Sequence, residues 1–155
     1  MNEQELVAKY SSLHSGRDRT NFGALDVLHA EGSGLDALLY GFLFWPEFVE
    51  YQGMIFRRDT VEDDDDRRCV DDALKRYGGD ASATEKSFNT VEIGSLFGAR
   101  SNETDDATDR DLALLLCEMW SARLAQVFHP YKCRVELVEP EVTGGSVGLI
   151  FWRER

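Results

Sequence analysis

The sequence contains few of the residues that most catalytic and cofactor-binding sites require. Its 155 residues include only three cysteines and three histidines. The cysteines form no C-x-x-C pair, and no Gly-Lys-Ser/Thr phosphate loop is present. Gly32-Ser33-Gly34 lacks the third glycine of a dinucleotide fingerprint. The sequence therefore predicts no cofactor, no catalytic residue and no nucleotide site.

Positive charge is also scarce. Lys and Arg total 17 whereas Asp and Glu total 29, which gives a formal net charge of −12 at pH 7. Binding to a phosphate backbone needs clustered cations, so this balance argues against a nucleic-acid partner. Because an acidic chain attracts cationic molecules, the same balance favours a basic protein partner.

Long apolar runs are absent as well. The most apolar stretch, Leu35 to Trp45, is too short to span a bilayer and contains Asp36. The first five residues are acidic and polar, unlike the basic start and apolar run of a signal peptide. The odd number of widely spaced cysteines is typical of reduced thiols in a core. These features predict a cytoplasmic protein with no membrane partner.

The chain does contain a regular pattern of helix and strand. From Asp105 to Phe128, apolar residues occupy most of a helical circumference, which is typical of a buried helix. Pro130 ends this helix. The period then changes to two, which predicts strands near 133–137 and 147–152 joined by a turn at Gly144-Gly145.

A second hairpin is predicted from Phe48 to Arg57, with its turn at Gln52-Gly53. Helical spacing and capping patterns predict shorter helices at 3–13, 24–31, 35–45, 61–77 and 80–88. The expected fold is α+β, with two β-hairpins forming a mainly antiparallel sheet of about four strands. Helices pack on this sheet, and the long C-terminal helix is central. We expect a single domain over 1–155, with an exposed acidic loop at 98–108.

Two groups of residues raise the question of a metal. Asp63 to Asp66 are contiguous, whereas the ligands of a calcium loop alternate along the chain, so a solvated helix start is the preferred interpretation. Cys117, His129 and Cys133 offer three zinc ligands, but without the paired spacing of zinc sites. The sequence therefore predicts no metal site.

The candidate interaction or pocket residues lie in the hairpin after Trp45-Pro46 and in the acidic run. Aromatic residues between positions 42 and 56 are dense, and Trp and Tyr often anchor protein interfaces, although they also fill cores. Glu47, Glu50 and Glu136 are candidates for an acid–base pair, or else ordinary solvent-facing residues of strands. The candidates are Trp45, Glu47, Phe48, Glu50, Tyr51, Asp63, Asp64, Asp65 and Asp66.

The stretch Leu43-Phe44-Trp45-Pro46-Glu47-Phe48-Val49-Glu50, followed by Gln52-Gly53 and Met54-Ile55-Phe56, resembles one in small bacterial proteins of unknown function. The resemblance covers about fifteen residues and is an analogy only. Some small acidic bacterial proteins of similar size are immunity proteins of contact-dependent toxin systems. The resemblance therefore implies an immunity-like role and carries no catalytic residues.

Three functions remain open at this point. The first is a cytoplasmic acidic interaction module that neutralises a basic partner, with 62–66 and 103–111 as contact surfaces. The second is a small enzyme or small-molecule-binding domain with a pocket between sheet and helices, lined by Trp45, Tyr51, Trp120, His129 and Trp152. The third is a homo-oligomeric structural protein that pairs through its last strand, Val147 to Trp152.

Overall fold

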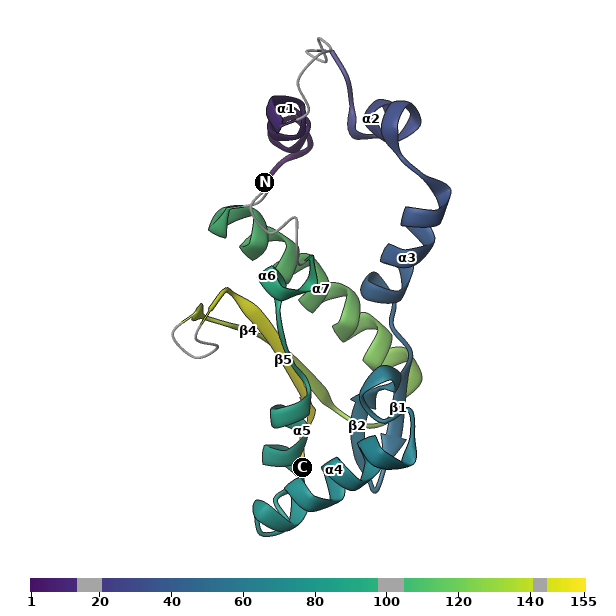
Figure 1. Cartoon of the computed structure of the whole chain (residues 1–155), viewed down its shortest axis with the longest axis vertical. Coiled ribbons are helices and arrows are strands. Elements are labelled where there is room, and N and C mark those ends of the chain that lie inside the picture. The colour runs from purple at the N-terminus through teal and green to yellow at the C-terminus, as the bar shows by residue number, and fades with distance from the viewer. Residues whose placement is uncertain (14–20, 98–104, 141–144) are drawn as a thin grey trace. The chain divides into compact units, whose positions relative to one another are not determined.

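The computed structural model describes residues 1–13, 21–97, 105–140 and 145–155 (Figure 1). The helices are α1 (Glu3–Leu13), α2 (Ala24–Glu31), α3 (Gly34–Phe44), α4 (Asp64–Arg76), α5 (Ala81–Phe88), α6 (Ile93–Leu96) and α7 (Asp106–Val127). The strands are β1 (Phe48–Tyr51), β2 (Met54–Arg57), β3 (Thr90–Glu92), β4 (Cys133–Val138) and β5 (Gly148–Arg153), with a 3-10 turn, η1 (Arg58–Thr60), after β2. The predicted α+β class is confirmed.

The chain divides into two compact units, residues 1–41 and 42–155. In the first unit, α1 meets the start of α2, where a Glu3 carboxylate oxygen accepts the backbone N–H of Ala24 at 2.7 Å. Val7 and Val27 supply its buried side chains. This unit therefore has a small core.

The hairpin β1–β2 opens the second unit. Its strands are antiparallel, with Phe48 opposite Arg57 and Tyr51 opposite Met54. Gln52 and Gly53 between them have φ values of 51° and 75°. A two-residue turn with both residues at positive φ has the twist that joins antiparallel strands directly. The hairpin predicted for this stretch is confirmed.

A separate three-stranded antiparallel sheet has the order β3-β5-β4. The described strands thus form two small sheets, where the sequence predicted one sheet of about four strands. The extra strand, β3, is only three residues long, and its short apolar pattern does not distinguish a strand from an extended connector. Because β5 lies between β3 and β4, a homodimer through this last strand would have to displace one of its neighbours.

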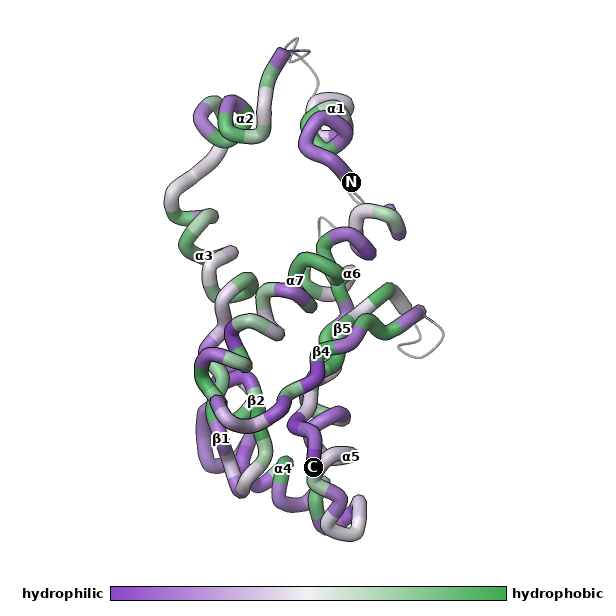
Figure 2. The backbone as a smooth tube through the Cα atoms, turned by 180° about the vertical axis from the view of Figure 1, so that it is seen from behind, coloured by the Kyte–Doolittle hydropathy of each residue, from purple (hydrophilic) through white to green (hydrophobic). Residues whose placement is uncertain are grey.

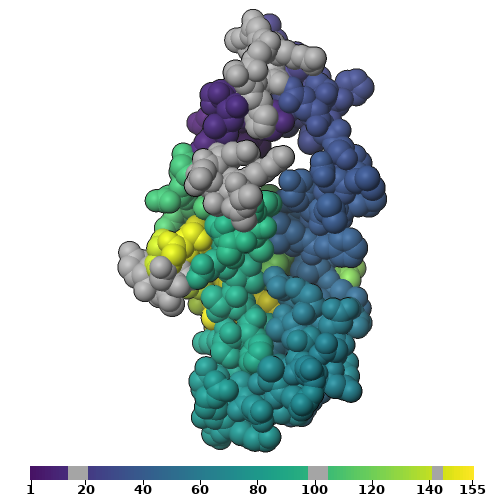
Figure 3. Space-filling model, in the orientation of Figure 1, coloured from purple at the N-terminus to yellow at the C-terminus, as the bar shows by residue number. Residues whose placement is uncertain are grey.

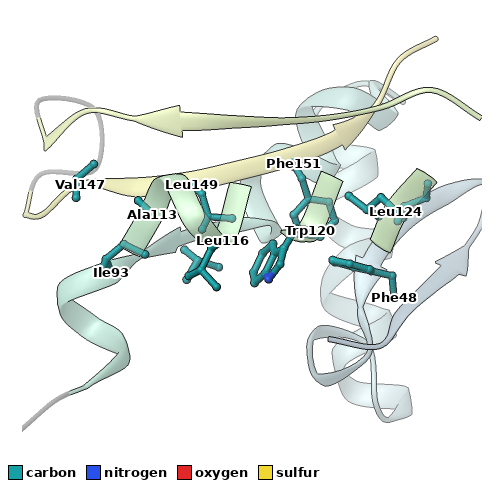
Figure 4. Packing of buried hydrophobic residues seen from close by; sticks show 11 residues of the cluster. Phe48, Ile93, Ala113, Leu116, Trp120, Leu124, Val147, Leu149 and Phe151 are labelled. Carbon is teal, nitrogen blue, oxygen red and sulfur yellow. The ribbon is translucent and has the colours of Figure 1, made fainter. Parts of the chain in front are cut away.

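Helix α7 begins where the Asp105 carboxylate caps it by accepting the backbone N–H of Thr108 at 2.9 Å. The last residues of the acidic loop predicted at 98–108 therefore belong to this helix and its cap, and residues 98–104 lie outside the described part. Every third or fourth side chain of α7 is buried, namely Ala113, Leu116, Trp120 and Leu124. Figure 4 shows them pointing toward Leu149 and Phe151 of β5.

Three aromatic rings join the hairpin to this core. Phe48, Trp120 and Phe151 contact one another edge to face, with ring centroids 5.1–5.7 Å apart (Figure 4). Such pairs stabilise a core beyond the area that they bury. The Trp120 indole N–H donates to the backbone oxygen of Leu43 at 2.8 Å, so the last turn of α3 is tied to α7. Some of the aromatic residues that are dense between positions 42 and 56 therefore lie in the core.

A buried polar bridge, formed by Glu85 and Asn89, joins the two sheets. The Glu85 carboxylate accepts the backbone N–H groups of Ile55 on β2 at 2.7 Å and of Arg153 on β5 at 3.3 Å. The Asn89 amide group donates to the backbone oxygens of Ile55 and Phe151, at 2.7 and 3.3 Å. Both side chains are almost completely buried. The bridge thus supplies hydrogen-bond partners to backbone groups at strand edges that are not paired with another described strand.

Candidate functional site

Most of the sequence-predicted candidates meet on one part of the second unit, which we call the acidic hairpin surface. It consists of Glu47, Tyr51, Glu62, Asp63, Asp64, Asp65 and Asp66. Glu47 immediately precedes strand β1 and Tyr51 ends it, whereas the other five residues form the turn into α4 and its first residues. Figure 3 shows the α4 region in teal in the lower part of the molecule. Six of the eight residues 59–66 are acidic, which makes this stretch the densest run of negative charge in the sequence.

The acidic run is built as the start of a helix. Asp63 accepts the backbone N–H groups of Asp65 and Asp66 at 2.8 and 2.9 Å. Asp66 reaches back to accept the N–H of Asp63 at 3.3 Å, which completes a capping box. This agrees with the helix start that the sequence favoured over a calcium loop. Asp63 and Asp66 thus fix the backbone while the side chains between them face solvent.

Asp64 and Asp65 are highly accessible carboxylates of the run. Their side chains are 94% and 79% exposed. Asp64 pairs with Arg67 at 3.5 Å, and Asp65 pairs with Arg68, each one helical turn further along α4. Ion pairs this exposed contribute little to stability, so both carboxylates remain available to a cationic partner.

An exposed ion pair connects the start of β1 with the turn before α4. The Arg58 guanidinium binds the Glu47 carboxylate through two contacts of 2.5 Å. Hydrogen bonding to Arg58 holds the pKa of Glu47 below its usual range, and the same bond raises the pKa of Arg58. Glu47 is therefore ionised and is not a proton donor at neutral pH.

The other end of β1 is tied to α4 through Tyr51. Its hydroxyl donates to the Asp71 carboxylate at 3.0 Å, and the Gln52 side-chain amide donates to the same oxygen at 2.8 Å. The Arg67 guanidinium lies 6.0 Å from the centroid of the Tyr51 ring. Strand and helix thus present their acidic groups from one packed frame.

Three of the predicted candidates lie apart from this surface. Phe48 is only 4% exposed and belongs to the aromatic core, so it is not accessible to a partner. Trp45 is 45% exposed, with the Arg123 guanidinium 5.5 Å from its ring centroid. Glu50 pairs with Ile55 of the core, so its side chain lies on the face of the hairpin opposite to Tyr51 and α4. Six of the nine candidates thus share the acidic hairpin surface.

The zinc candidates are separate residues with unremarkable surroundings. Within the described ranges, no group of three His, Cys, Asp or Glu residues is placed to hold a metal ion. Burial raises the pKa of the Cys117 thiol, and burial together with the nearby Glu85 raises the pKa of Cys133 to about 11. At neutral pH both are protonated thiols, which are poor metal ligands and poor nucleophiles.

The proposed lining residues of a pocket between sheet and helices do not come together. Trp120 fills that space with Leu116 and Leu149, and all three are fully buried. Trp152 instead lines an open hollow of about 700 Å³ at the end of β5, together with Tyr131, Lys132 and Arg153. His129 is exposed. The core side of the sheet thus offers no room for a substrate among these residues.

Two of the cations at this hollow, Arg153 and Arg155, are engaged within the chain. The Arg153 guanidinium lies 3.4 Å from the centroid of the Tyr131 ring and donates to the backbone oxygen of Gly53 at 3.2 Å. Arg155 donates to the same oxygen at 2.9 Å and pairs with Glu85 at 2.6 Å. These contacts tie the end of the chain to the hairpin turn and to the polar bridge, which is a structural role.

Residues 144–148 carry the spacing G-x-S-x-G, which is typical of a nucleophile elbow. An elbow places its serine between a strand and a following helix. Here Ser146 precedes strand β5, and its hydroxyl oxygen accepts the backbone N–H of Gly94 at 3.0 Å. The local structure therefore differs from an elbow, and the serine instead holds the start of α6.

Sequence reasoning missed the polar bridge, although a signal was present. Ala81, Thr84, Glu85 and Phe88 recur at the three- and four-residue spacing of one helical face. Glu85 thus falls on the inner face of α5, and Asn89 follows one turn later. An acidic residue among apolar positions indicates a buried polar contact.

Comparisons with protein-family models, with curated proteins and with solved structures were made for the whole chain. No match was found. In the described part, none of the helices has both the length and the apolar composition needed to cross a membrane.

Proposed function

We propose that this chain is an acidic protein-interaction module that binds a basic protein through the acidic hairpin surface. In its most specific form, the partner is a basic toxin that the chain neutralises, by analogy with immunity proteins, which include small acidic bacterial proteins of similar size. A compartment in which both proteins meet, such as the cytoplasm, is part of this proposal.

The observation that carries the proposal is the way this surface is held. Asp63 and Asp66 use their carboxylates to cap α4, which fixes the backbone of the turn. Tyr51 and Gln52 bind Asp71, which fixes strand β1 against the same helix. Asp64 and Asp65 therefore project from a rigid frame, and a preorganised surface loses less entropy on binding than a mobile one.

Charge complementarity explains how such a surface finds its partner. The net charge of −12 steers a basic protein toward the chain before contact. Electrostatic potentials of opposite sign on the two proteins then orient the partner and speed its association more than they raise the final affinity. The proposed interaction is therefore sensitive to ionic strength.

Capture of partners from a lysate of the source cell, at low and at high ionic strength, tests this function. We expect one basic protein to be retained in stoichiometric amount at low ionic strength and to be released as salt is added. Replacing Asp64 and Asp65 with asparagine should reduce its retention. If no basic protein is retained at any ionic strength, the proposal is wrong.

A further inference from the structure

Strand β4 (Cys133–Val138) lies at one edge of the three-stranded sheet. Strand β5 pairs with one side of it, and no strand among the described residues pairs with the other side. Such an edge presents unpaired N–H and C=O groups, to which another strand can add. Hydrophilic and hydrophobic residues alternate along β4, as the purple and green segments of its tube show in Figure 2. The edge therefore belongs to a regular strand in which each side chain has a defined face.

The direction of these backbone groups follows from the ladder between β4 and β5. The Lys132 backbone oxygen accepts the Glu154 N–H at 2.8 Å, and this pair continues the register of the two strands. In an antiparallel ladder, such bonded pairs alternate with pairs whose N–H and C=O groups point away from the partner strand. The residues of β4 whose backbone groups point outward are therefore Cys133, Val135 and Leu137.

An open hollow of about 500 Å³ follows this edge. Residues 131–136 and Glu154 line one side of it, and Ser121 and Ala125 of α7 line the other. The two α7 side chains are small, so they leave room for another strand beside β4. All of these residues belong to the second unit. The described part of the first unit contains helices and no strand, so that part adds no strand to this edge.

Two residues of opposite charge, Arg134 and Glu136, lie on the face of β4 that points away from α7. Their side chains are 55% and 51% exposed, and they contact each other at 3.6 Å. Arg134 also pairs with Glu154. Charged residues on an edge strand often prevent pairing with another strand. Here the opposite charges are two positions apart, so the strand is complementary to an antiparallel copy of itself.

We propose that β4 of one chain pairs with β4 of a second copy, antiparallel and with the two-fold axis at Val135. Outward-pointing residues must bond to one another, so the residue opposite Val135 is Cys133, Val135 or Leu137 of the second copy. The first choice sets Arg134 against Arg134, and the last sets Glu136 against Glu136. The pairing of Val135 with Val135 instead sets each Arg134 against a Glu136. The same surface then meets itself, as a two-fold interface requires, and the two sheets become one.

The short length of β4 indicates a weak dimer. One pair of short strands, with the side chains beside it, forms an interface at the lower end of the specific range. We therefore expect a dissociation constant on the order of 10 µM to 1 mM. The pairing shares no residue with the acidic hairpin surface, so the affinity for a basic partner should not depend on it.

Sedimentation of the full chain between about 1 µM and about 1 mM tests the dimer. Wild type should shift from monomer toward dimer over this range. Arg134→Glu should raise the dissociation constant at least about 10-fold, because it sets like charges opposite each other on both sides of the axis. Lys75→Glu is the matched control, since it makes the same change in charge at an exposed residue of α4 and should change the constant by less than about 2-fold. A wild-type chain that stays monomeric, or a control as disruptive as Arg134→Glu, would overturn the proposal.

A charge-exchange experiment tests the register. Chains carrying Arg134→Glu and chains carrying Glu136→Arg should each dimerise less than wild type, because positions 134 and 136 then carry the same charge. An equimolar mixture should recover the dimer, since every pair across the axis again joins opposite charges. A chain that carries both changes should also dimerise as wild type does. If the mixture or the double variant stays monomeric while its near-UV circular dichroism matches that of wild type, the proposed pairing is wrong.

Discussion

Replacing Glu85 with alanine should be among the most destabilising single changes in the second unit. The Glu85 side chain is fully buried and binds the backbone N–H of Ile55, the backbone N–H of Arg153 and the Arg155 guanidinium. Ile55 is itself fully buried, so its N–H would have no acceptor after the change. An unsatisfied buried donor costs about 1–3 kcal/mol.

The total should be larger, because the change also removes one partner of an ion pair. Breaking a buried pair in this way costs about 3–5 kcal/mol, and the partial exposure of Arg155 moves the expectation to the lower half of that range. Asn89→Ala should cost about 1–3 kcal/mol, for two lost hydrogen bonds to carbonyls. Since both residues bind Ile55, the two changes should not be additive.

Urea unfolding followed by tryptophan fluorescence measures these free energies, because Trp120 is fully buried in the folded chain. Ser87→Ala is the control: Ser87 is exposed on the same helix and should change stability by less than about 0.5 kcal/mol. If Glu85→Ala costs no more than this control, the buried polar bridge does not hold the two sheets together.

The remaining predictions concern the core, the α4 cap and the thiols. Trp120→Phe should lower the free energy of unfolding by about 2–4 kcal/mol, measured by urea unfolding followed by circular dichroism, because it loses the bond to Leu43 and part of a buried ring. Asp63→Ala should cost about 1 kcal/mol as a lost helix cap, and no measurable loss would show that the cap is not needed. Alkylation mapped by mass spectrometry should modify exposed Cys69 well before Cys133 at neutral pH, and equal rates would contradict the burial of Cys133. Because the folded pKa of Cys133 is about 11 and a free thiol titrates near 8.5, only the unfolded chain releases this proton between those values. Its contribution to stability should therefore fall as pH rises through that window, and Cys133→Ser should remove this part of the pH dependence.

Local patterns in the sequence predicted most of the elements. The turn at Gln52-Gly53, the cap before α4 and the apolar periodicity of α7 each depend on residues close together in the chain, so the hairpin and the helices were predictable. Strand pairing depends on distant residues. Val91 pairs with Leu149, and nothing in the three residues of β3 indicates that partner, so the two-sheet arrangement was not predicted.

The same limit applies to the candidate surface. The acidic character of Asp63 to Asp66 is evident in the sequence. The sequence does not show which of these carboxylates cap the helix and which remain exposed. Capping uses Asp63 and Asp66 and leaves Asp64 and Asp65 exposed. Phe48 illustrates the opposite case, because the pattern of β1 does not reveal that its ring lies against Trp120, which is 72 positions away.

The most direct test of the account is the affinity for the captured basic partner of two variants that carry the same net charge. Asp64→Asn with Asp65→Asn changes the acidic hairpin surface, whereas Glu118→Gln with Glu136→Gln removes two exposed carboxylates from α7 and β4. If the acidic hairpin surface is the binding site, the first pair should raise the dissociation constant about 10-fold and reduce its salt dependence, while the second should change it by less than about 2-fold. Equal effects of the two pairs would show that net charge alone attracts the partner and would contradict the assignment of this surface.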